Sequence, residues 1–477
     1  MSKIKDRCGR VLSVHIQTPP VSERQRLASL IPISQLVPLF LRVIVGTPAA
    51  ITATVTMAPL LNTLSLIVQA SLIIHSSPTS AAAIDRQPDS AAKVDKRSVS
   101  QYAPTSVSCP ANVSLVRPGS DLSESESSYI TSRKTKADAA LTSWLEGLDS
   151  SFPTTSLPSL GLALTGGGLR ATLIGAGIVQ ALDSRDSNAG TSGLFQSLTY
   201  LSALSGGGWL TGSLAGNDWP TVSTLKESLW HENFQDSLLD PAYLLATTAY
   251  LEIVTDIIAK AETEAQVSIV DVYGRLLGYQ FLKGSDGGVA KTFSGLASNS
   301  NFTESSVGTS HLLFGRSILT VQVPFPILTA RGLEAGACII EPTSPQYEYT
   351  PYEFGSWDAG ISAFTPIEYL GSHLTGGSPT TPGKCVSNYD NLAFVMGTSS
   401  NVFNGLCTTI TPVNSTSDLV QTLEAIVARA HEALERDLYA LVPNPFYNYD
   451  NVSVAGQSEL HIVDGGELDQ AVPLWPL

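Results

Sequence analysis

Basic residues are scarce in this chain, and their scarcity restricts the partners that we expect. The 477 residues hold 27 Lys or Arg against 42 Asp or Glu, a formal net charge of −15. Residues 1–97 hold eleven basic and five acidic residues, so residues 98–477 carry a net charge of −21. A protein that binds nucleic acid needs a basic face, and basic segments are likewise what anionic lipid headgroups attract. We therefore exclude nucleic acid as a partner and expect little attraction to anionic headgroups.

The sequence also lacks a clean apolar run of about twenty residues, the length that a transmembrane helix needs. An apolar run that ends in small residues, as a secretory signal does, begins at Met57. We interpret residues 57–83 as this signal and residues 1–56 as an extension that a gene-model error would explain. Residues 84–97 are then a pro-segment that ends in the dibasic pair Lys96–Arg97. The alternative is a membrane tether within residues 29–75.

Cysteine and histidine are rare, and no cluster of the two has the spacing of metal ligands. We therefore expect neither a metal nor a cofactor. Cys8 lies in the leader, and the four later cysteines allow two disulfides in any of three pairings. These four are Cys109, Cys338, Cys385 and Cys407. The sequence also has four candidate N-glycosylation sites, which are Asn112, Asn301, Asn414 and Asn451.

Residues 98–477 have the pattern of one continuous α/β catalytic domain, without an internal repeat. Apolar periodicity predicts alternating helices and strands. The predicted helices cover residues 127–148, 170–182 and 417–441, and the predicted strands cover 160–165, part of 193–204 and a segment that ends at 464. The apolar segment 241–265 is predicted to be a core helix, with a lid over the substrate as the alternative.

A glycine turn follows the first strand, in the sequence LALTGGGLRA. Gly166, Gly168 and Ala171 have the spacing G-x-G-x-x-A, which is typical of a dinucleotide-binding turn. A dinucleotide site also needs an acidic residue at the end of a second strand, about twenty residues later. Asp183 and Asp186 lie at that distance, but in a segment with the pattern of a helix end and loop. The same backbone N–H groups could instead bind the oxyanion of an acyl-transfer reaction.

A second strand–turn–helix pattern, YLSALSGGGWLTGS, places Ser205 at the apex of its turn. A nucleophilic serine needs a sharp turn that exposes its Oγ, small neighbours and a helix start behind it. Gly206, Gly207 and Gly208 provide the small neighbours. A separate turn of backbone donors beside such a serine favours acyl transfer over dinucleotide binding.

The partner of Ser205 is predicted to be an acidic residue, not a histidine. An α/β-hydrolase has its triad in the order Ser, Asp or Glu, His, and no histidine follows Asp464, the best acidic candidate. His461 precedes Asp464 by three residues, so a strand would direct the two to opposite faces. Asp464 ends an apolar strand at a Gly-Gly turn. We therefore favour a Ser–Asp dyad, with a Ser-His-Asp esterase as the alternative.

Three long blocks of the sequence resemble the signature blocks of the fungal secreted lysophospholipases, also called phospholipase B. They are LTGGGLRA, TYLSALSGGGWLTGSL and VDGGELDQAVPLWPL. The resemblance runs from Tyr102 to the last residue. This family shares a catalytic module with cytosolic phospholipase A2 and, more distantly, with patatin. The resemblance implies a three-layer α/β/α fold with a central mixed sheet. It also implies hydrolysis of fatty acyl esters of lysophospholipids, and often of diacyl phospholipids, through an acyl-enzyme and without a metal or cofactor.

The resemblance assigns a role to each matched residue. Ser205 is similar to the family's nucleophile and Asp464 to the base that activates it. Gly167 and Gly168 resemble the oxyanion donors, and Arg170 resembles the arginine that binds the substrate phosphate. The partners implied are the phospholipid or lysophospholipid and the micelle or membrane surface that carries it.

The chain departs from the family pattern at three places. Thr165 stands where the family usually has serine, and it keeps a hydroxyl group. Ala203 replaces the glycine that lies two residues before the nucleophile. The chain stops at Leu477, where family members continue, so the fold is expected to be incomplete at its carboxyl end.

We predict that the protein is secreted, extracellular or bound to the cell wall, and that its mature chain begins between Ala81 and Ser98. N-terminal sequencing of secreted material should find a start in that interval, and an endoglycosidase should increase its electrophoretic mobility. A product that is confined to the cell lysate, unglycosylated and still carrying residues 1–56 would contradict the prediction.

Overall fold

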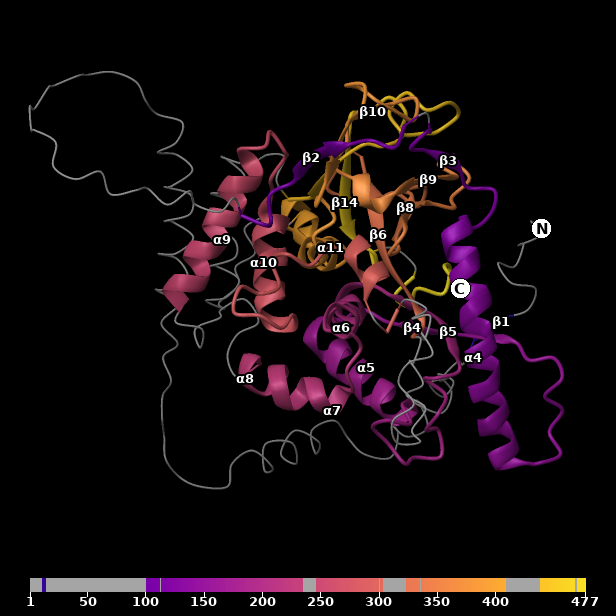
Figure 1. Cartoon of the computed structure of the whole chain (residues 1–477). Coiled ribbons are helices and arrows are strands. Elements are labelled where there is room, and N and C mark those ends of the chain that lie inside the picture. Colours follow the sequence, from indigo (N-terminus) through magenta and orange to yellow (C-terminus); the bar gives the residue numbers. More distant parts are fainter. Residues whose placement is uncertain are drawn as a thin grey trace, which may run out of the picture. The chain divides into compact units, whose positions relative to one another are not determined.

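The computed structural model describes residues 11–13 and 100–477, except residues 112, 235–245, 300, 303–322, 335, 409–437 and 468–469. Before residue 100 it contains the short strand β1 (Val11–Ser13). The elements from residue 100 onward are drawn in Figure 1 and form the α/β body that contains the candidate site.

A mixed sheet lies at the centre of this body (Figure 1). Three neighbouring strands are parallel, namely β4 (Ser159–Leu164), β5 (Leu198–Ala203) and β6 (Phe325–Leu333). All six residues of β5 are buried, as is usual for a parallel strand that is covered on both faces. Beyond β6 the sheet continues with antiparallel pairings through β7 (Gln346–Tyr349), β8 (Glu353–Ser356), β9 (Ala363–Pro366) and β3 (Arg117–Pro118).

The strand that ends in Asp464 joins the sheet on the same side of β6 as β5. This strand, β14 (Glu459–Asp464), pairs antiparallel with the second half of β6, and β13 (Ala440–Pro443) pairs with β14. Ala330 of β6 is opposite both Tyr347 of β7 and Asp464 of β14, so these two strands lie on opposite sides of β6. Because β7 occupies one side, β5 and β14 share the other side.

Helices cover both faces of the sheet, which confirms the predicted three-layer arrangement. On one face, Tyr129 of α4 (Glu124–Leu148) packs on Phe325 of β6, with ring centroids 5.3 Å apart. Leu328 lies three residues after Phe325 in the same strand and therefore points to the opposite face. On that face it packs beside Gly208 of α6 (Ser205–Gly216). In Figure 1, α5 (Gly168–Leu182) runs next to α6, while α10 (Ile269–Phe281) and α11 (Leu392–Thr398) form a second group.

Most of the predicted elements are confirmed by the structure, at α4, β4, α5, β5 and β14. The predicted helix over residues 417–441 is wrong at its end, because residues 440 and 441 belong to strand β13 and pair with Ile462 and His461. Its residues 417–437 lie outside the described residues.

The shorter elements are α7 (Val222–Leu225), the π-helix η2 (Lys226–Trp230), α8 (His231–Asn233), η4 (Ser294–Ser298), η5 (Ile367–Tyr369), η6 (Phe403–Thr408), β2 (Thr105–Ser108), β10 (Leu374–Thr375), β11 (Ser378–Pro379) and β12 (Lys384–Ser387).

The apolar segment 241–265 contains helix α9 (Ala246–Ala261), whose described apolar residues pack as a core helix does. Ala249 and Ile253 are buried in a cluster with Tyr279 of α10. Two further apolar residues of this segment cannot be compared, because Leu244 and the side chain of Leu251 lie outside the described residues. None of the helices in the described ranges combines the length and the apolar character that crossing a membrane requires.

A buried cluster of charged groups joins α9 and α10 to the start of the described body. Lys260 pairs with Asp271 at 2.6 Å, and Arg275 pairs with Asp256 at 2.9 Å. The phenol of Tyr102 donates to the same Asp271 at 2.8 Å. Because removing one partner leaves a buried charge, breaking either pair is expected to cost about 3–5 kcal/mol of unfolding free energy.

A disulfide between Cys109 and Cys385 fixes β2 to β12, which pair antiparallel. This pairing belongs to one of the three connectivities that the sequence allows. Cys338 is disulfide-bonded as well.

The glycines that follow Ser205 are required by close packing between backbones. A Cβ on Gly207 would lie 2.5 Å from the carbonyl oxygen of Leu164 at the end of β4, and one on Gly206 would overlap the carbonyl oxygen of Gly168. The starts of α5 and α6 are therefore held together through positions that only glycine fits.

We predict that Gly207→Ala lowers the free energy of unfolding by about 1–3 kcal/mol, because its methyl group meets backbone that must move. Gly177→Ala in α5 is the matched control, since its Cβ meets nothing within 4 Å. Alanine is about 0.5–1 kcal/mol better than glycine within a helix, so the control should be neutral or stabilised. Urea denaturation of both variants measures the difference, and equal midpoints would contradict the prediction.

Candidate active site

The ends of β5 and β14 meet beside the middle of β6, and this brings Ser205 and Asp464 together. Ala203, the last residue of β5, is opposite Leu328, and Asp464, the last residue of β14, is opposite Ala330. The two strands approach each other from opposite directions, and only Thr329 of β6 separates their ends. The residues that follow each strand therefore emerge at one place.

Ser205 has the backbone conformation of a strained nucleophile turn. Its φ is 51°, in the left-handed region that residues other than glycine adopt rarely. It begins helix α6 two residues after Ala203, the last residue of β5, and its N–H donates to the carbonyl oxygen of Ser399 at 3.0 Å. The buried methyl group of Ala203 is accommodated inside β5, where it is fully covered. The sequence prediction of a sharp strand–turn–helix at Ser205 is thus confirmed in its geometry.

The buried carboxylate of Asp464 lies beside the Ser205 side chain, which lowers the pKa of this carboxyl group as a hydrogen-bond donor does. Asp464 accepts the N–H of Gly466 on its carboxylate at 2.6 Å, and its own N–H donates to Asn401 O at 2.8 Å. Burial raises the pKa of Asp464, and the interactions with Ser205 and Gly466 offset part of the increase. The carboxylate is therefore a stronger base than an exposed aspartate would be.

The glycine turn before α5 lies against Ser205. A Cβ on Gly166 would approach the Ser205 Cβ to 2.9 Å. The N–H of Gly166 donates to Ala471 O at 3.3 Å, and the Thr165 hydroxyl donates to the same oxygen at 2.7 Å. Gly167 and Gly168 have φ values of 128° and 61°, and within the described residues no acceptor is seen for their N–H groups. These two N–H groups, at the start of α5, are therefore available to an anion.

Arg170 lies in the first turn of α5 and is exposed. In the part of the chain that the structure describes, no ion pair of Arg170 is present. A cation at a helix start interacts unfavourably with the helix dipole. The position is therefore explained better by a bound anion than by the stability of the helix.

Asp183 has a structural role that does not fit a dinucleotide site. It ends α5, pairs with Arg185 at 2.7 Å and accepts a hydrogen bond from Gln196 at 2.7 Å. Burial alone would raise the pKa of Asp183, but the bonds from Arg185 and Gln196 outweigh it and lower the pKa. In a dinucleotide fold, moreover, the strand after this helix ends in the carboxylate that binds the ribose. In this chain the strand after α5 is β5, and it leads to Ser205 instead.

The histidine closest in sequence to Asp464 faces away from it. Nε2 of His461 lies 3.1 Å from a carboxylate oxygen of Glu459, and its ring stacks on Tyr439 with centroids 5.1 Å apart. His231 and His373 are exposed, and His311 and His431 lie outside the described residues. Among the described residues, the titratable group that interacts with the Ser205 side chain is thus the Asp464 carboxylate.

One functional segment was missed by the sequence reasoning, the loop 399–401 that follows α11. The carbonyl oxygen of Ser399 accepts the N–H groups of both Ser205 and Gly465, at 3.0 and 3.3 Å, and its hydroxyl donates to Thr329 O at 2.7 Å. The carbonyl oxygen of Asn401 likewise accepts the N–H of Asp464, at 2.8 Å. The Asn391 cap of α11 and the small residues of the loop are the available signals in the sequence, but neither indicates these distant partners.

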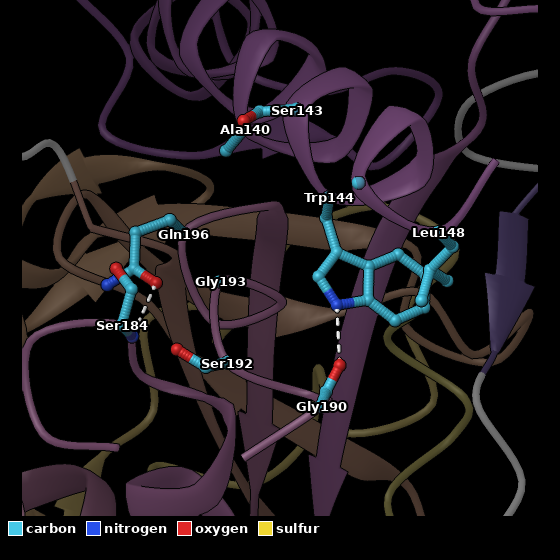
Figure 2. A pocket seen from close by; sticks show the side chains of 10 residues that line it. Ala140, Ser143, Trp144, Leu148, Ser184, Gly190, Ser192, Gly193 and Gln196 are labelled. Carbon is cyan, nitrogen blue, oxygen red and sulfur yellow. Dashed lines mark hydrogen bonds between the residues drawn. The ribbon is translucent and has the colours of Figure 1, made fainter. Parts of the chain in front are cut away.

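Within the described ranges, no group of three or more His, Cys, Asp and Glu side chains could hold a metal ion. An open pocket of about 570 Å³ lies between α4 and the loop 184–196, where Trp144 donates to Gly190 O and Gln196 accepts from the Ser184 N–H (Figure 2). This pocket is at the amino end of β5, whereas Ser205 follows the carboxyl end. It is therefore separate from the candidate active site.

Comparisons with known proteins show which family this chain resembles. The model of the lysophospholipase catalytic domain matches residues 160–477. Lysophospholipase 1 of Aspergillus fumigatus is 34% identical over 406 residues, which cover 79% of this chain and 61% of that protein. Lysophospholipase 3 of Candida albicans is 35% identical over 402 residues, which cover 79% of this chain and 51% of that protein. A lysophospholipase of Torulaspora delbrueckii is 36% identical over 409 residues, which cover 79% of this chain and 60% of that protein.

Among solved structures, human GIVD cytosolic phospholipase A2 is similar with a TM-score of 0.55 and 17% identity, over 77% of this chain and 52% of that one. This likeness shows a shared fold. The chain spans less than two thirds of the length of the three relatives. The family match covers every candidate catalytic and substrate-binding residue, and the chain belongs to the family of the lysophospholipase catalytic domain.

Proposed function

We propose that this chain hydrolyses the fatty acyl esters of lysophospholipids, and of diacyl phospholipids, through an acyl-enzyme on Ser205. Asp464 acts as the base, the N–H groups of Gly167 and Gly168 bind the oxyanion, and Arg170 binds the substrate phosphate. The observation that carries the proposal is the Ser205 side chain beside the buried Asp464 carboxylate, where the ends of β5 and β14 meet, next to a glycine turn with two available N–H donors.

The first half of the reaction forms the acyl-enzyme. Asp464 takes the proton of the Ser205 hydroxyl while Oγ attacks the ester carbonyl. The negative charge that develops on the carbonyl oxygen is stabilised by donors already oriented at the start of α5, a term worth about 3–4 kcal/mol for each donor in related chemistry. The protonated Asp464 then gives its proton to the departing alcohol oxygen of the glycerophosphoryl group.

The second half releases the fatty acid. Asp464, ionised again, takes a proton from water, and the hydroxide attacks the acyl carbonyl at the same oxyanion site. Collapse of this intermediate returns the proton to Ser205 Oγ and frees the fatty acid. A carboxylate is a weak base for an alcohol, so burial, which raises the pKa of Asp464, supports this role.

The proposed cellular location is the secretory pathway, with the mature protein secreted or bound to the cell wall. The Cys109–Cys385 disulfide supports an oxidising compartment. Of the candidate glycosylation sites, Asn451 is exposed, and Asn301 donates from its side chain to Asp218 O at 2.9 Å. Asn112 and Asn414 lie outside the described residues.

Ser205→Ala is predicted to reduce fatty acid release from lysophosphatidylcholine by at least about a thousandfold, because loss of the nucleophile removes the covalent step. Ser213→Ala is a control on the same helix, since the Ser213 hydroxyl donates to Phe281 O, away from the site. Activity of Ser205→Ala equal to that of the parent chain would contradict the assignment. In that case, saturable binding of NAD would favour the dinucleotide alternative.

Arg170→Lys is predicted to reduce turnover of lysophosphatidylcholine about tenfold or more, with little effect on a p-nitrophenyl ester that has no phosphate. An ammonium keeps the charge but loses the two-pronged hydrogen bonding that suits a phosphate. The ratio of kcat/KM for the two substrates measures the effect. Equal losses on both substrates would mean that Arg170 has a structural role only.

A further inference from the structure

A second carboxylate lies on the turn that carries Asp464. The turn contains Asp464, Gly465, Gly466 and Glu467, and it is closed by hydrogen bonds within itself. The Gly466 N–H donates to the Asp464 carboxylate at 2.6 Å, and the Glu467 N–H donates to Asp464 O at 3.4 Å. The positions of the two acidic residues are therefore coupled through a short, closed backbone.

The side chain of Glu467 is held in place by Asn404. Asn404 is 1% exposed, lies in η6 and donates from Nδ2 to Glu467 Oε2 at 2.8 Å. Glu467 is itself half-buried. Burial raises the pKa of Glu467, the bond from Asn404 opposes the increase, and the charge of Asp464 raises the pKa further. The turn bond from Glu467 to Asp464 O keeps the Cα atoms of the two residues within about 7 Å of each other, and two negative charges so close raise each other's proton affinity.

The remaining groups around Asp464 do not cancel this charge. Tyr273 of α10 interacts with Asp464 electrostatically, and burial keeps its pKa well above the usual range, so its phenol is neutral. Arg331 of β6 is opposite Val463, the neighbour of Asp464 in β14, and it therefore points to the other face of the sheet. Glu459 and His461 bond to each other on that other face.

Within the described residues, no salt bridge reaches either carboxylate. Asp469 lies outside the described residues.

We propose that Glu467 is a positioning residue that acts through Asp464, because Asn404 anchors its negative charge on the turn that carries the catalytic base. The inference rests on the proposed function for its catalytic meaning. A base that must take a proton from an alcohol works better as its own proton affinity rises toward the working pH. A like charge held nearby in a partly buried site provides this increase without a histidine.

Glu467→Gln tests the proposal, because the amide oxygen of glutamine still accepts the bond from Asn404 while the charge is removed. The acidic limb of kcat/KM for a soluble p-nitrophenyl ester should move to lower pH by about 0.5–1 unit. The plateau at high pH should fall about three- to tenfold, since the base is weaker. Glu459→Gln removes a carboxylate from the same strand on the other face and is the matched control, with an unchanged limb expected.

A direct titration separates this proposal from the proposed function. Carbon-13 NMR of labelled aspartate carboxyls, with the Asp464 signal identified by its loss in Asp464→Asn, reports the titration of Asp464 whether or not esters are hydrolysed. We expect two coupled steps in the parent chain and one step, at lower pH, in Glu467→Gln. Glu467→Ser provides a second charge-removing variant if Glu467→Gln does not fold.

An unchanged Asp464 titration in a folded variant that lacks the charge would overturn the inference. Failure of the parent chain to release p-nitrophenol, together with a shifted titration, would overturn only the proposed function.

Discussion

The constraint on which the site depends is the shared side of β6, along which two strands of opposite direction meet end to end. β5 pairs with the first half of β6 and β14 with the second half, and Thr329 lies between their ends. If either strand shifted by two residues away from the other, Ser205 and Asp464 would move about 7 Å further apart along β6. The register of these two strands is therefore as important to the proposed chemistry as the two side chains are.

Close contacts between backbones keep this register. A Cβ on Gly465 would overlap Thr329 O, and Gly206 and Gly207 are in contact with the turn before α5. The loop after α11 adds one acceptor, Ser399 O, that binds the N–H groups following both strands. The four parts of the site, which are two strand ends, a glycine turn and a loop, are thus fixed by main-chain contacts. Such contacts leave little freedom for reorganisation during a reaction, as preorganised electrostatic stabilisation requires.

The local parts of this site could be predicted from the sequence, and the long-range parts could not. The two strand–glycine–helix patterns around Gly167 and Ser205 are visible because period, turn chemistry and small residues all occur within a few positions. Asp464 is visible because it ends an apolar run at Gly-Gly.

The partnership of Asp464 with Ser205 was predicted from the order of the acidic and histidine residues and from the family resemblance. The geometry behind it was not, because it depends on the pairing of β14 with β6, whose residues are more than a hundred positions apart, and no local pattern encodes that register. The same limit explains why residues 440 and 441 were predicted as helix. Their apolar spacing fits a helical face, but their pairing with β14 decides the outcome. It also explains why two hydrogen bonds were not predicted, the one from the Ser205 N–H to Ser399 O and the one from Asn404 to Glu467.

The most direct test of the central claim is covalent labelling with an alkyl fluorophosphonate, which reacts with a serine only when that serine is activated and its oxyanion is stabilised. Mass spectrometry of the digested protein should show one adduct, on the peptide that contains Ser205. In Asp464→Asn, whose amide oxygen can accept the Ser205 hydrogen bond but cannot take the proton, labelling should be slower by at least about a hundredfold. An adduct on another residue, or labelling of Asp464→Asn at the rate of the parent chain, would contradict the account.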